Sequence, residues 1–515
     1  MATVEAPVAQ AATVEDCLWM VVVAAVAAFA QSITVGASLT ANCWGPALGA
    51  KAVPFKVALV LGVICQSLGV LVFGPEEYIV YGGLLDESNK LAPYPREAMY
   101  SLMWIVVTPV IWQALSIWQK TLVPAYLGTV ASTAGAILVF PGGAALEFGM
   151  TSSSPPFVTG LGSILIIWAC APIISVSLTG SCYLKTRDWL FRSSEHDPMH
   201  RVLWVLPLTA SAVSVICGLM MIYAIGSPRG TTAFQTTPQG TCIILAALAS
   251  LASIGMCLGV PNMSRRHRSR KPIPIKRMNL LGLDETTMKD LAAEDVTTDV
   301  QGWLRWAHAH FLQVDLFKSV PASDTLMRIH STAEEFDSTA EDFLAPFQIT
   351  LGVFLSLAFG ANSAHTSFGI LAMMRQIQKS GTVSASASLG IRLRCISAIG
   401  TAIGTLLWGK RLAPITGVCL AKMTPFRSYI VVASVAGAVA ILGTFQMKGG
   451  VITYVIVSAV AAVGLAEGTS HVNWRLLAKI LLWWVAGFCL TMVATSALIA
   501  QGMYSPSLVS DRPGT

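Results

Sequence analysis

Residues 17–38 read CLWMVVVAAVAAFAQSITVGAS and contain no charged side chain. An apolar run of about 20 residues is long enough to cross the ~30 Å hydrocarbon core of a bilayer as an α-helix. Lipid offers no hydrogen-bond partners, so such a run must satisfy its own N–H and C=O groups by forming a helix. The stretch therefore predicts a transmembrane helix, which continues directly into the small and polar residues of 35–42.

Similar apolar runs fill most of the 515-residue chain, of which 54% is hydrophobic and 12% charged. Soluble proteins average roughly 25% charged residues, so the lipid bilayer is the expected surrounding. We predict an all-α polytopic membrane protein with about twelve transmembrane helices. The predicted spans are 17–38, 55–74, 99–119, 122–146, 157–181, 201–226, 240–260, 347–375, 386–408, 427–446, 450–467 and 475–502.

The 11 cysteines show no C-x-x-C spacing, and most fall inside these spans. They are therefore interpreted as small apolar packing residues rather than a disulfide framework. Residues 1–16 lack Lys and Arg, so no cleavable signal peptide is expected.

Lys and Arg gather in alternate loops when the N-terminus is placed outside. By the positive-inside rule, both termini should face outside and the 261–345 loop should face the cytosol. Arg375, Lys379 and Lys448 run against this pattern. The net charge of +6 reflects the inside bias and indicates no nucleic-acid partner. The plasma membrane is the default location, because no retrieval signal ends the chain.

The polar region 261–345 opens with the basic run Arg265–Lys271. We interpret this run as a stop-transfer anchor on anionic headgroups, with a regulatory site as the alternative. Aromatic and apolar residues then recur at helical spacing, which predicts an amphipathic helix in the cytosolic interface: they are Trp303, Trp306, His310, Phe311, Val314 and Phe317. His308 and His310 lack nearby Cys or paired carboxylates, so neither a metal site nor a cofactor is predicted.

The halves that flank this region are similar to each other. Each begins with a span that enters a Gly-Ala motif, VGASLTAN at 35–42 and FGANSAHT at 359–366. Each later has an interrupted apolar stretch, at 126–149 and 443–465, and each closes with a Trp-bearing helix.

We divide the chain into a first repeat, two extra spans, the cytosolic loop and a second repeat: 1–180, 181–260, 261–345 and 346–515. Two extra spans make the halves begin on opposite sides of the membrane. The prediction is therefore two inverted-topology repeats with broken helices or re-entrant segments, as in secondary transporters.

A helix that is broken inside the membrane presents unpaired N–H groups and the positive end of its dipole to a cavity. Such an end binds phosphate or sulfate without a cationic side chain. Close packing between helices uses the same Gly, Ser and Ala residues. For each Gly-Ala motif, packing therefore stays open beside binding.

With these motifs the chain resembles the inorganic phosphate transporter family, the sodium- or proton-coupled phosphate permeases, whose signature is G-A-N-D-V-A-N in each half. The similar stretches include WGKR at 408–411 and VNWR at 472–475. The resemblance implies twelve spans, inverted repeats and coupled transport of inorganic phosphate, with a sulfate permease as a close variant. It implies no enzyme activity, and a homodimer remains open.

This sequence departs from the family at its acidic positions. The signature Asp positions hold Leu39 and Ser363, and the Glu positions correspond to Gln66 and Val432. A cation in a low-dielectric site is held most strongly by anionic oxygen, so the coupling cation, Na⁺ or H⁺, stays open. A transport-silent member that acts as a sensor or assembly partner is the alternative function.

Together with the resemblance, the remaining polar residues indicate a neutral oxyanion cradle contributed by both halves. Its candidate substrate-binding residues are Ser38, Asn42, Ser132, Thr133, Asn362, Ser363, Thr366 and Thr453. His365 is the titratable group within a signature and is the candidate for proton coupling. The alternative for His365 is a hydrogen-bonded structural histidine.

Overall fold

The computed structural model describes residues 17–73, 77–79, 95–139, 160–192, 198–225, 238–269, 323–383, 386–444 and 450–504. Within these residues, nine helices are long and apolar enough to cross a membrane, and three further apolar helices are shorter. The prediction of an all-α multi-pass membrane protein is confirmed. The amphipathic helix expected around Trp303, together with His308 and His310, lies outside the described residues.

Helices, π-helical turns and two short strands follow one another along the chain. They are α2 (Leu18–Leu39), η1 (Thr40–Trp44), α3 (Gly45–Gly49), α4 (Phe55–Leu68), η2 (Gly69–Phe73), β1 (Glu77–Ile79), α5 (Pro95–Trp118), α6 (Ala125–Val139), α7 (Gly160–Arg187), η4 (Asp188–Arg192), α8 (Pro198–Leu219), η5 (Met220–Ile225), α9 (Pro238–Ser269), α13 (Asp324–Thr332), α14 (Ser338–Asp342), α15 (Ala345–Ser380), β2 (Ser386–Ser388), α16 (Ile391–Pro414), η8 (Ile415–Cys419), α17 (Pro425–Thr444), α18 (Ile452–Glu467), the 3₁₀ turn η9 (Thr469–His471) and α19 (Trp474–Tyr504).

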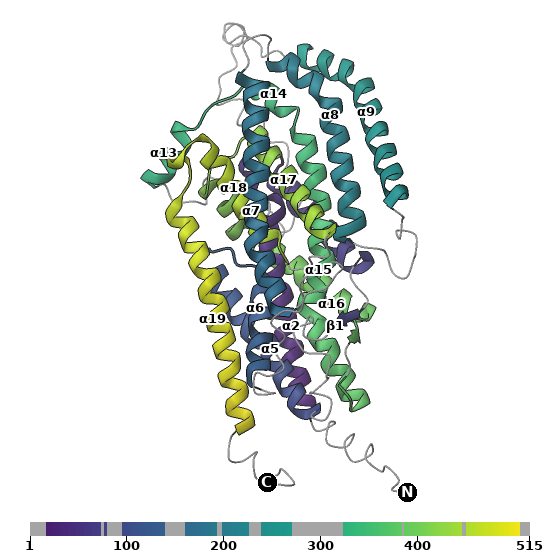
Figure 1. Ribbon diagram of the computed structural model, residues 1–515, viewed down its shortest axis with the longest axis vertical. Helices are drawn as coiled ribbons and strands as arrows, with labels where there is room; N and C mark the ends of the chain where they lie inside the picture. Colours follow the sequence, from purple (N-terminus) through teal and green to yellow (C-terminus); the bar gives the residue numbers. More distant parts are fainter. Residues whose placement is uncertain are drawn as a thin grey trace, which may run out of the picture.

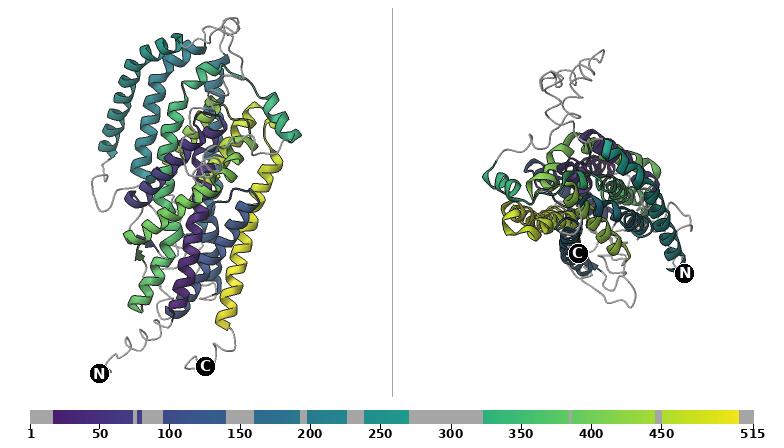
Figure 2. Two further views of the ribbon diagram at one scale, coloured as in Figure 1. Left: turned by 180° about the vertical axis from the view of Figure 1, so that it is seen from behind. Right: turned by 90° about the horizontal axis from the view of Figure 1, so that it is seen from above.

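The helices form a tall bundle in which the two halves run in opposite directions (Figure 1). Helix α2 starts at the lower end and rises, whereas α15 starts near α14 at the upper end and descends. Helices α7 and α19 show the same opposition, and α19 ends at the lower end, where α2 begins (Figures 1 and 2). Opposite directions for matching helices are the arrangement expected of inverted repeats.

Each contact between a helix of the first half and a helix of the second half has a counterpart in which the two halves have swapped roles. Helix α2 packs along α16, and α15 packs along α4; likewise α7 packs along α18, and α19 along α6. Helices α5 and α6 form one hairpin, and α17 and α18 form its counterpart. Helices α8 and α9 pack on each other beside this core. This correspondence between the helix contacts of the two halves supports the proposal of two repeats with two inserted helices.

The Gly-Ala motifs are sites of close helix packing. A Cβ atom added to Gly36 would overlap the backbone oxygen of Thr401 on α16, and one added to Gly404 would overlap the oxygen of Ile33. In the second half, a Cβ atom on Gly360 would overlap the oxygen of Gln66 on α4. Small residues let helix backbones approach each other this closely in a membrane. Packing, the alternative left open for these motifs, therefore accounts for both glycines.

The second Gly-Ala motif lies within a continuous helix. Helix α15 continues unbroken from Ala345 to Ser380, and α2 is interrupted only by the π-helical turn η1. The physical reason is that Gly360 packs against α4, while hydroxyl groups of the motif bond carbonyl groups of their own helix. Ser363 Oγ donates to the oxygen of Gly360 at 2.9 Å, and Thr366 Oγ1 donates to the oxygen of Asn362 at 3.1 Å.

Two predicted spans are shorter than expected. The described helices in 122–146 and 450–467 are α6 and α18, with 15 and 16 residues. Crossing the hydrocarbon core takes about 20 helical residues, so neither helix is a full span by itself. Each instead forms the returning arm of a hairpin.

Substituting Gly36 tests the packing role. We expect Gly36→Ala to lower the thermal unfolding midpoint of the detergent-purified protein, because overpacking of a close contact costs about 1–3 kcal/mol. Gly180→Ala is the matched control in a helix, since nothing lies within 4 Å of a Cβ atom there. The control should leave the midpoint unchanged or raise it, because Ala favours a helix over Gly by roughly 0.5–1 kcal/mol. Equal midpoints for the two variants would contradict the packing role.

Candidate functional site

Two helical hairpins approach each other from opposite halves of the bundle, α5–α6 from below and α17–α18 from above (Figures 1 and 2). Gly450, with a φ of +61°, lies two residues before the start of α18 at Ile452. A Cβ atom on Gly450 would lie 2.6 Å from the Cβ atom of Tyr126 in the first turn of α6. The starts of the two short helices therefore meet.

Trp484 of α19 holds this junction together. Its Nε1 donates to the backbone oxygen of Leu122, in the α5–α6 connection, at 2.8 Å. Its ring lies 4.7 Å, centroid to centroid, from the ring of Tyr454 in the first turn of α18. Trp168 of α7 stacks on the same tyrosine at 5.6 Å. The Trp-bearing helices noted in the sequence thus both contact the start of α18.

The starts of α6 and α18 present unpaired backbone N–H groups at the junction. Helix α6 begins directly after Pro124, and α18 begins after Val451 without a side-chain cap. The first N–H groups of a helix lack intrahelical partners and carry the positive end of the dipole. Two helix N-termini that meet at one place favour the binding of an anion there.

Buried polar atoms without hydrogen-bond partners lie on the elements around this junction. They are the hydroxyl of Tyr454, both amide atoms of Asn42 and Nε2 of Gln113. These residues are 3%, 0% and 4% exposed, respectively, and η1, which contains Asn42, packs against α18. A buried unpaired polar group costs about 1–3 kcal/mol, so such groups are rare and are expected where a polar ligand binds.

A small cavity lies beside the α5–α6 turn. Its polar lining comes from Thr34 and Ser38 of α2, from Gln113 and Ser116 of α5, and from Thr121, and its volume is about 10 Å³. Thr34 Oγ1 donates to Gln113 Oε1 at 2.6 Å, which leaves Gln113 Nε2 available as a donor. This volume suffices for about one water molecule. The cavity as it stands is therefore too small for an oxyanion, which is larger than water.

The structure brings three of the predicted residues to this region. Ser38 lines the cavity, with its Oγ donating to the oxygen of Val35 at 2.8 Å. Asn42 lies in η1 beside α18, and Thr453 is buried in the first turn of α18.

The other predicted residues make contacts within or between helices. Ser132 and Thr133 are buried in α6, where their hydroxyls donate to the oxygens of Ile105 at 3.0 Å and Thr129 at 2.7 Å. Ser363 and Thr366 bond carbonyl groups of their own helix. Asn362 is exposed and donates to the oxygen of Ala358 at 2.9 Å, and His365 is half-buried on α15. These residues are not among those that line the described cavity.

The positions that carry acids in the family signature are neutral and mostly buried in this chain. Leu39 and Val432 are 0% exposed, and Ser363 is 3% exposed. Gln66 is also fully buried, and its Oε1 accepts from Thr405 Oγ1 at 3.3 Å. The same Thr405 hydroxyl donates to the oxygen of Gly36 at 2.9 Å. Gln66 and Thr405 therefore place the two signature motifs close together.

A buried ion pair closes the upper end of the α17–α18 hairpin. Arg427 at the start of α17 donates through Nε to Glu467 Oε1 at 2.7 Å, and these side chains are 1% and 5% exposed. Tyr183 of α7 donates to the same carboxylate. Arg427 Nη2 also donates to the backbone oxygen of Glu334 at 2.6 Å, which ties the polar segment before α14 to the helices.

His330 of α13 joins this upper end as well. Its Nε2 lies 3.0 Å from the backbone oxygen of Val418, and Lys422 donates to its backbone oxygen at 3.0 Å. Burial lowers the pKa of His330, and the nearby charge of Lys422 lowers it further. The segment that contains α13 is therefore docked through a histidine that favours its neutral form.

The sequence analysis did not single out Tyr454, Gln113 or the Arg427–Glu467 pair, which the structure places at the junction and at the upper end of the α17–α18 hairpin. The sequence feature that could have identified two of them is an uncharged polar side chain inside an apolar run. Such side chains are rare in membranes and commonly functional. Gln113 in 99–119 and Tyr454 in 450–467 both fit that description. Arg427 and Glu467 lie at the ends of apolar runs, where charged residues ordinarily act as interfacial anchors.

Breaking the buried pair should destabilise the protein. We expect Arg427→Gln to lower the thermal unfolding midpoint strongly, because removal of one partner of a buried ion pair costs about 3–5 kcal/mol. Arg192→Gln is the control, since its pair with Glu334 is half-exposed and exposed pairs contribute about 0–1 kcal/mol. Equal effects of the two substitutions would show that the Arg427 pair is not structurally important.

Comparison with known proteins agrees with this geometry. The family model described as "Phosphate transporter family" matches residues 35–495. A Chlamydia pneumoniae protein named as a phosphate permease is 22% identical over 463 residues, which cover 88% of this chain and 92% of the relative. The human sodium-dependent phosphate transporter 2 is 27% identical over 172 residues, covering 33% of this chain and 26% of the relative.

A solved structure of a sodium-dependent phosphate transporter superposes with a TM-score of 0.66 at 16% identity, covering 94% of this chain and 99% of that chain. This likeness shows the fold. Because the family model spans most of the sequence, the chain belongs to the phosphate transporter family.

Proposed function

We propose that this chain transports inorganic phosphate across a membrane as a secondary transporter, binding the oxyanion between the starts of α6 and α18. The observation that supports this most directly is the contact of Gly450 with Tyr126, where two short helices from opposite hairpins meet at their N-termini. Family membership and relatives named as phosphate permeases support phosphate as the substrate.

Neutral donors account for the binding chemistry. Free N–H groups at the two helix starts supply the positive ends of their dipoles. The Tyr454 hydroxyl and Gln113 Nε2 add side-chain donors, and the Ser38 hydroxyl adds another when it turns from the oxygen of Val35 toward the cavity. Hydrogen bonds to a charged group contribute about 1.5–3 kcal/mol each. A few such bonds hold an oxyanion without a lysine or arginine.

The position of the two hairpins also suggests how access alternates. The α5–α6 hairpin covers the site from the lower half of the bundle, and the α17–α18 hairpin covers it from the upper half. Movement of one hairpin at a time opens the site to one side of the membrane, as in other inverted-repeat transporters. We propose that both termini face outside and that the central loop is cytosolic, in a plasma membrane.

The residues that replace the family's acids bear on the choice of coupling cation. Several relatives are named as sodium-dependent, whereas Leu39, Ser363, Gln66 and Val432 supply no carboxylate in this chain. Carbonyl and hydroxyl oxygens bind Na⁺ more weakly than carboxylates do. His365 offers a proton carrier on α15. We propose that transport is cation-coupled, with Na⁺ and H⁺ to be separated by experiment.

Uptake of labelled phosphate into proteoliposomes tests the function. We expect uptake above that of empty liposomes, driven by an imposed Na⁺ gradient, a pH gradient or both, each applied separately. Proton coupling predicts that His365→Ala removes the pH dependence, whereas Na⁺ dependence would show that neutral oxygens suffice. Excess sulfate should not compete, and strong competition would instead indicate a sulfate permease. Phosphate binding without uptake would favour the sensor or assembly role.

Tyr454→Phe tests the binding site itself. The variant removes one proposed donor to the oxyanion, so we expect the KM for phosphate uptake to rise roughly tenfold or more. Its thermal unfolding midpoint should stay unchanged or rise, because a buried unpaired hydroxyl is removed. Tyr100→Phe is the matched control, since the Tyr100 hydroxyl donates to the oxygen of Leu498, away from the junction. An unchanged KM for Tyr454→Phe would exclude its hydroxyl from the site.

A further inference from the structure

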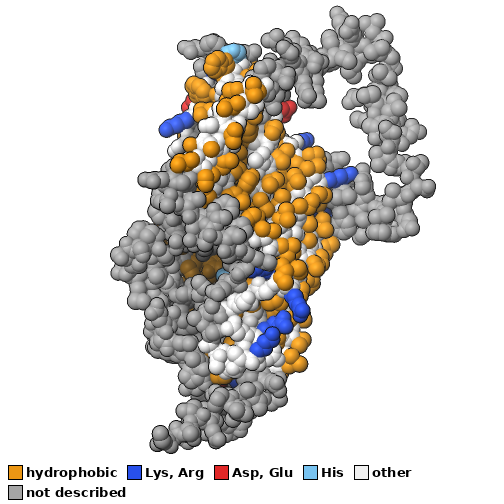
Figure 3. Space-filling view, turned by 90° about the vertical axis from the view of Figure 1, so that its right-hand side faces the viewer, with side chains coloured by type: hydrophobic (Ala, Val, Ile, Leu, Met, Phe, Trp, Pro, Cys, Tyr) orange, Lys and Arg blue, Asp and Glu red, His pale blue; other side chains and the backbone are white. Residues whose placement is uncertain are grey.

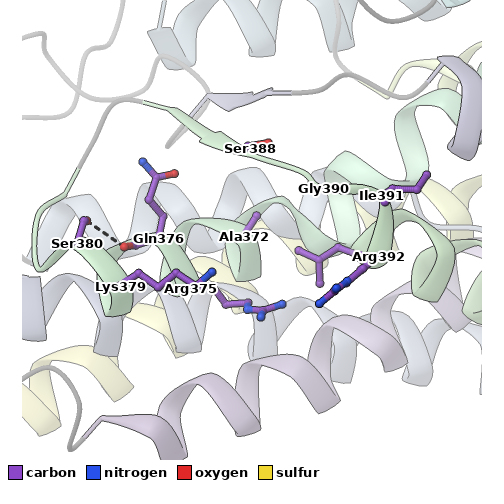
Figure 4. Close-up of a pocket in the computed structure, with 10 residues that line it drawn as sticks. Ala372, Arg375, Gln376, Lys379, Ser380, Ser388, Gly390, Ile391 and Arg392 are labelled. Carbon is purple, nitrogen blue, oxygen red and sulfur yellow. Dashed lines mark hydrogen bonds between the residues drawn. The ribbon is translucent and has the colours of Figure 1, made fainter.

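A second, larger pocket lies where α15 ends and α16 begins. Its volume is about 530 Å³, which falls within the usual range for small-molecule sites. Three cationic side chains line it: Arg375 and Lys379 of α15, and Arg392 of α16. The two arginine side chains point toward one another across the pocket (Figure 4). This pocket is distinct from the cavity at the hairpin junction, with which it shares no lining residue.

No acidic residue is among those that line this basic pocket in the described structure. Arg375 and Lys379 are four residues apart on one helix face, where like charges repel each other. Arg392 lies in the first turn of α16, where the helix dipole disfavours a cation and no acidic residue is present. Within the described part of the chain, the ion pairs involve none of the three. An anion bound in the pocket would attract all three cationic side chains and offset their mutual repulsion.

The surroundings supply further donors and an apolar flank. Ser380 and Ser388 also line the pocket, and the uncapped start of α16 provides backbone N–H groups. Ile391 lines the pocket and begins an exposed apolar stripe on α16 that continues through Ile396 and Ile399. On the side of the molecule seen in Figure 3, Lys and Arg side chains lie beside a broad hydrophobic surface. A cationic pocket next to a lipid-facing helix surface suits an amphiphilic phosphate ester.

We propose that the basic pocket binds a phosphate group through Arg375, Lys379 and Arg392, at the end of the bundle opposite α13 and α14. Arginine binds phosphate oxygens in a bidentate manner, and lysine adds a point charge. The group has two possible sources, which share this chemistry: the headgroup of an anionic phospholipid, or free inorganic phosphate held before transport. The proposal also explains why Arg375 and Lys379 depart from the positive-inside pattern. It does not depend on the proposed transport function.

Thermal unfolding of the purified full-length chain in detergent tests this proposal. Dihexanoyl phosphatidylglycerol and sodium phosphate are titrated separately, with dihexanoyl phosphatidylcholine as the uncharged reference. A ligand that binds the folded protein raises the unfolding midpoint in proportion to ln(1 + [L]/Kd). The test variant is Arg375→Gln/Lys379→Gln/Arg392→Gln. Its charge-matched control is Lys185→Gln/Arg328→Gln/Arg475→Gln, which alters exposed cations at the other end of the bundle.

We expect the apparent Kd for at least one of the two phosphate compounds to rise at least about tenfold in the test variant and to stay unchanged in the control. If the test variant loses affinity for phosphatidylglycerol alone, the pocket binds a lipid headgroup. If it loses affinity for sodium phosphate alone, the pocket binds the free ion. The ligand-induced shift is compared within each variant, so a lower starting midpoint does not obscure the result. Equal responses of the test and control variants to both compounds would overturn the proposal, and this outcome is independent of phosphate uptake.

Discussion

Backbone-to-backbone contact between helices is the constraint on which the rest of this structure depends. Gly36 and Gly404 let α2 and α16 touch, and Gly360 lets α15 touch α4. Lipid provides no hydrophobic driving force between helices, so van der Waals packing at small residues must hold them together. The contact also places Gln66 and Thr405 between the two halves. A single side chain larger than hydrogen at these positions separates the helices that frame the site.

This frame is completed by one large buried side chain. Trp44 of η1 is 1% exposed and donates through Nε1 to Ser356 Oγ of α15 at 2.9 Å. Gly62 and Gly352 make room for its ring, whose atoms lie 3.2 and 3.1 Å from Cβ atoms placed there. The π-helical turn η1 therefore directs Trp44 toward the second half, and η1 also packs against α18. Turns of this type inside helices occur frequently at functional sites.

Much of this architecture was predictable from hydropathy and from the resemblance between the halves. Apolar runs located the long helices, and the interrupted stretches at 126–149 and 443–465 marked the hairpins that meet at Gly450 and Tyr126. The Gly-Ala motifs left binding and packing open, because both use the same residues and only the neighbouring helix distinguishes them. The exposure of Asn362 could not be predicted from the sequence either, since it depends on how α15 is rotated within the bundle. The Arg427–Glu467 pair depends on two segments that are distant in sequence and adjacent only after folding.

The neutral residues at Leu39, Ser363, Gln66 and Val432 also bear on which step of the proposed transport cycle responds to voltage. Without fixed charge at these positions the empty site is neutral, so in that cycle the voltage acts on the loaded site, through the charge of the phosphate and its companion cations. Moving one elementary charge through 100 mV involves about 2.3 kcal/mol. An inside-negative potential therefore opposes import of a bare oxyanion and assists its export. Co-transported cations that match or exceed the negative charge of the phosphate remove this electrical opposition, and the combined gradients of the ions then set the direction of flow.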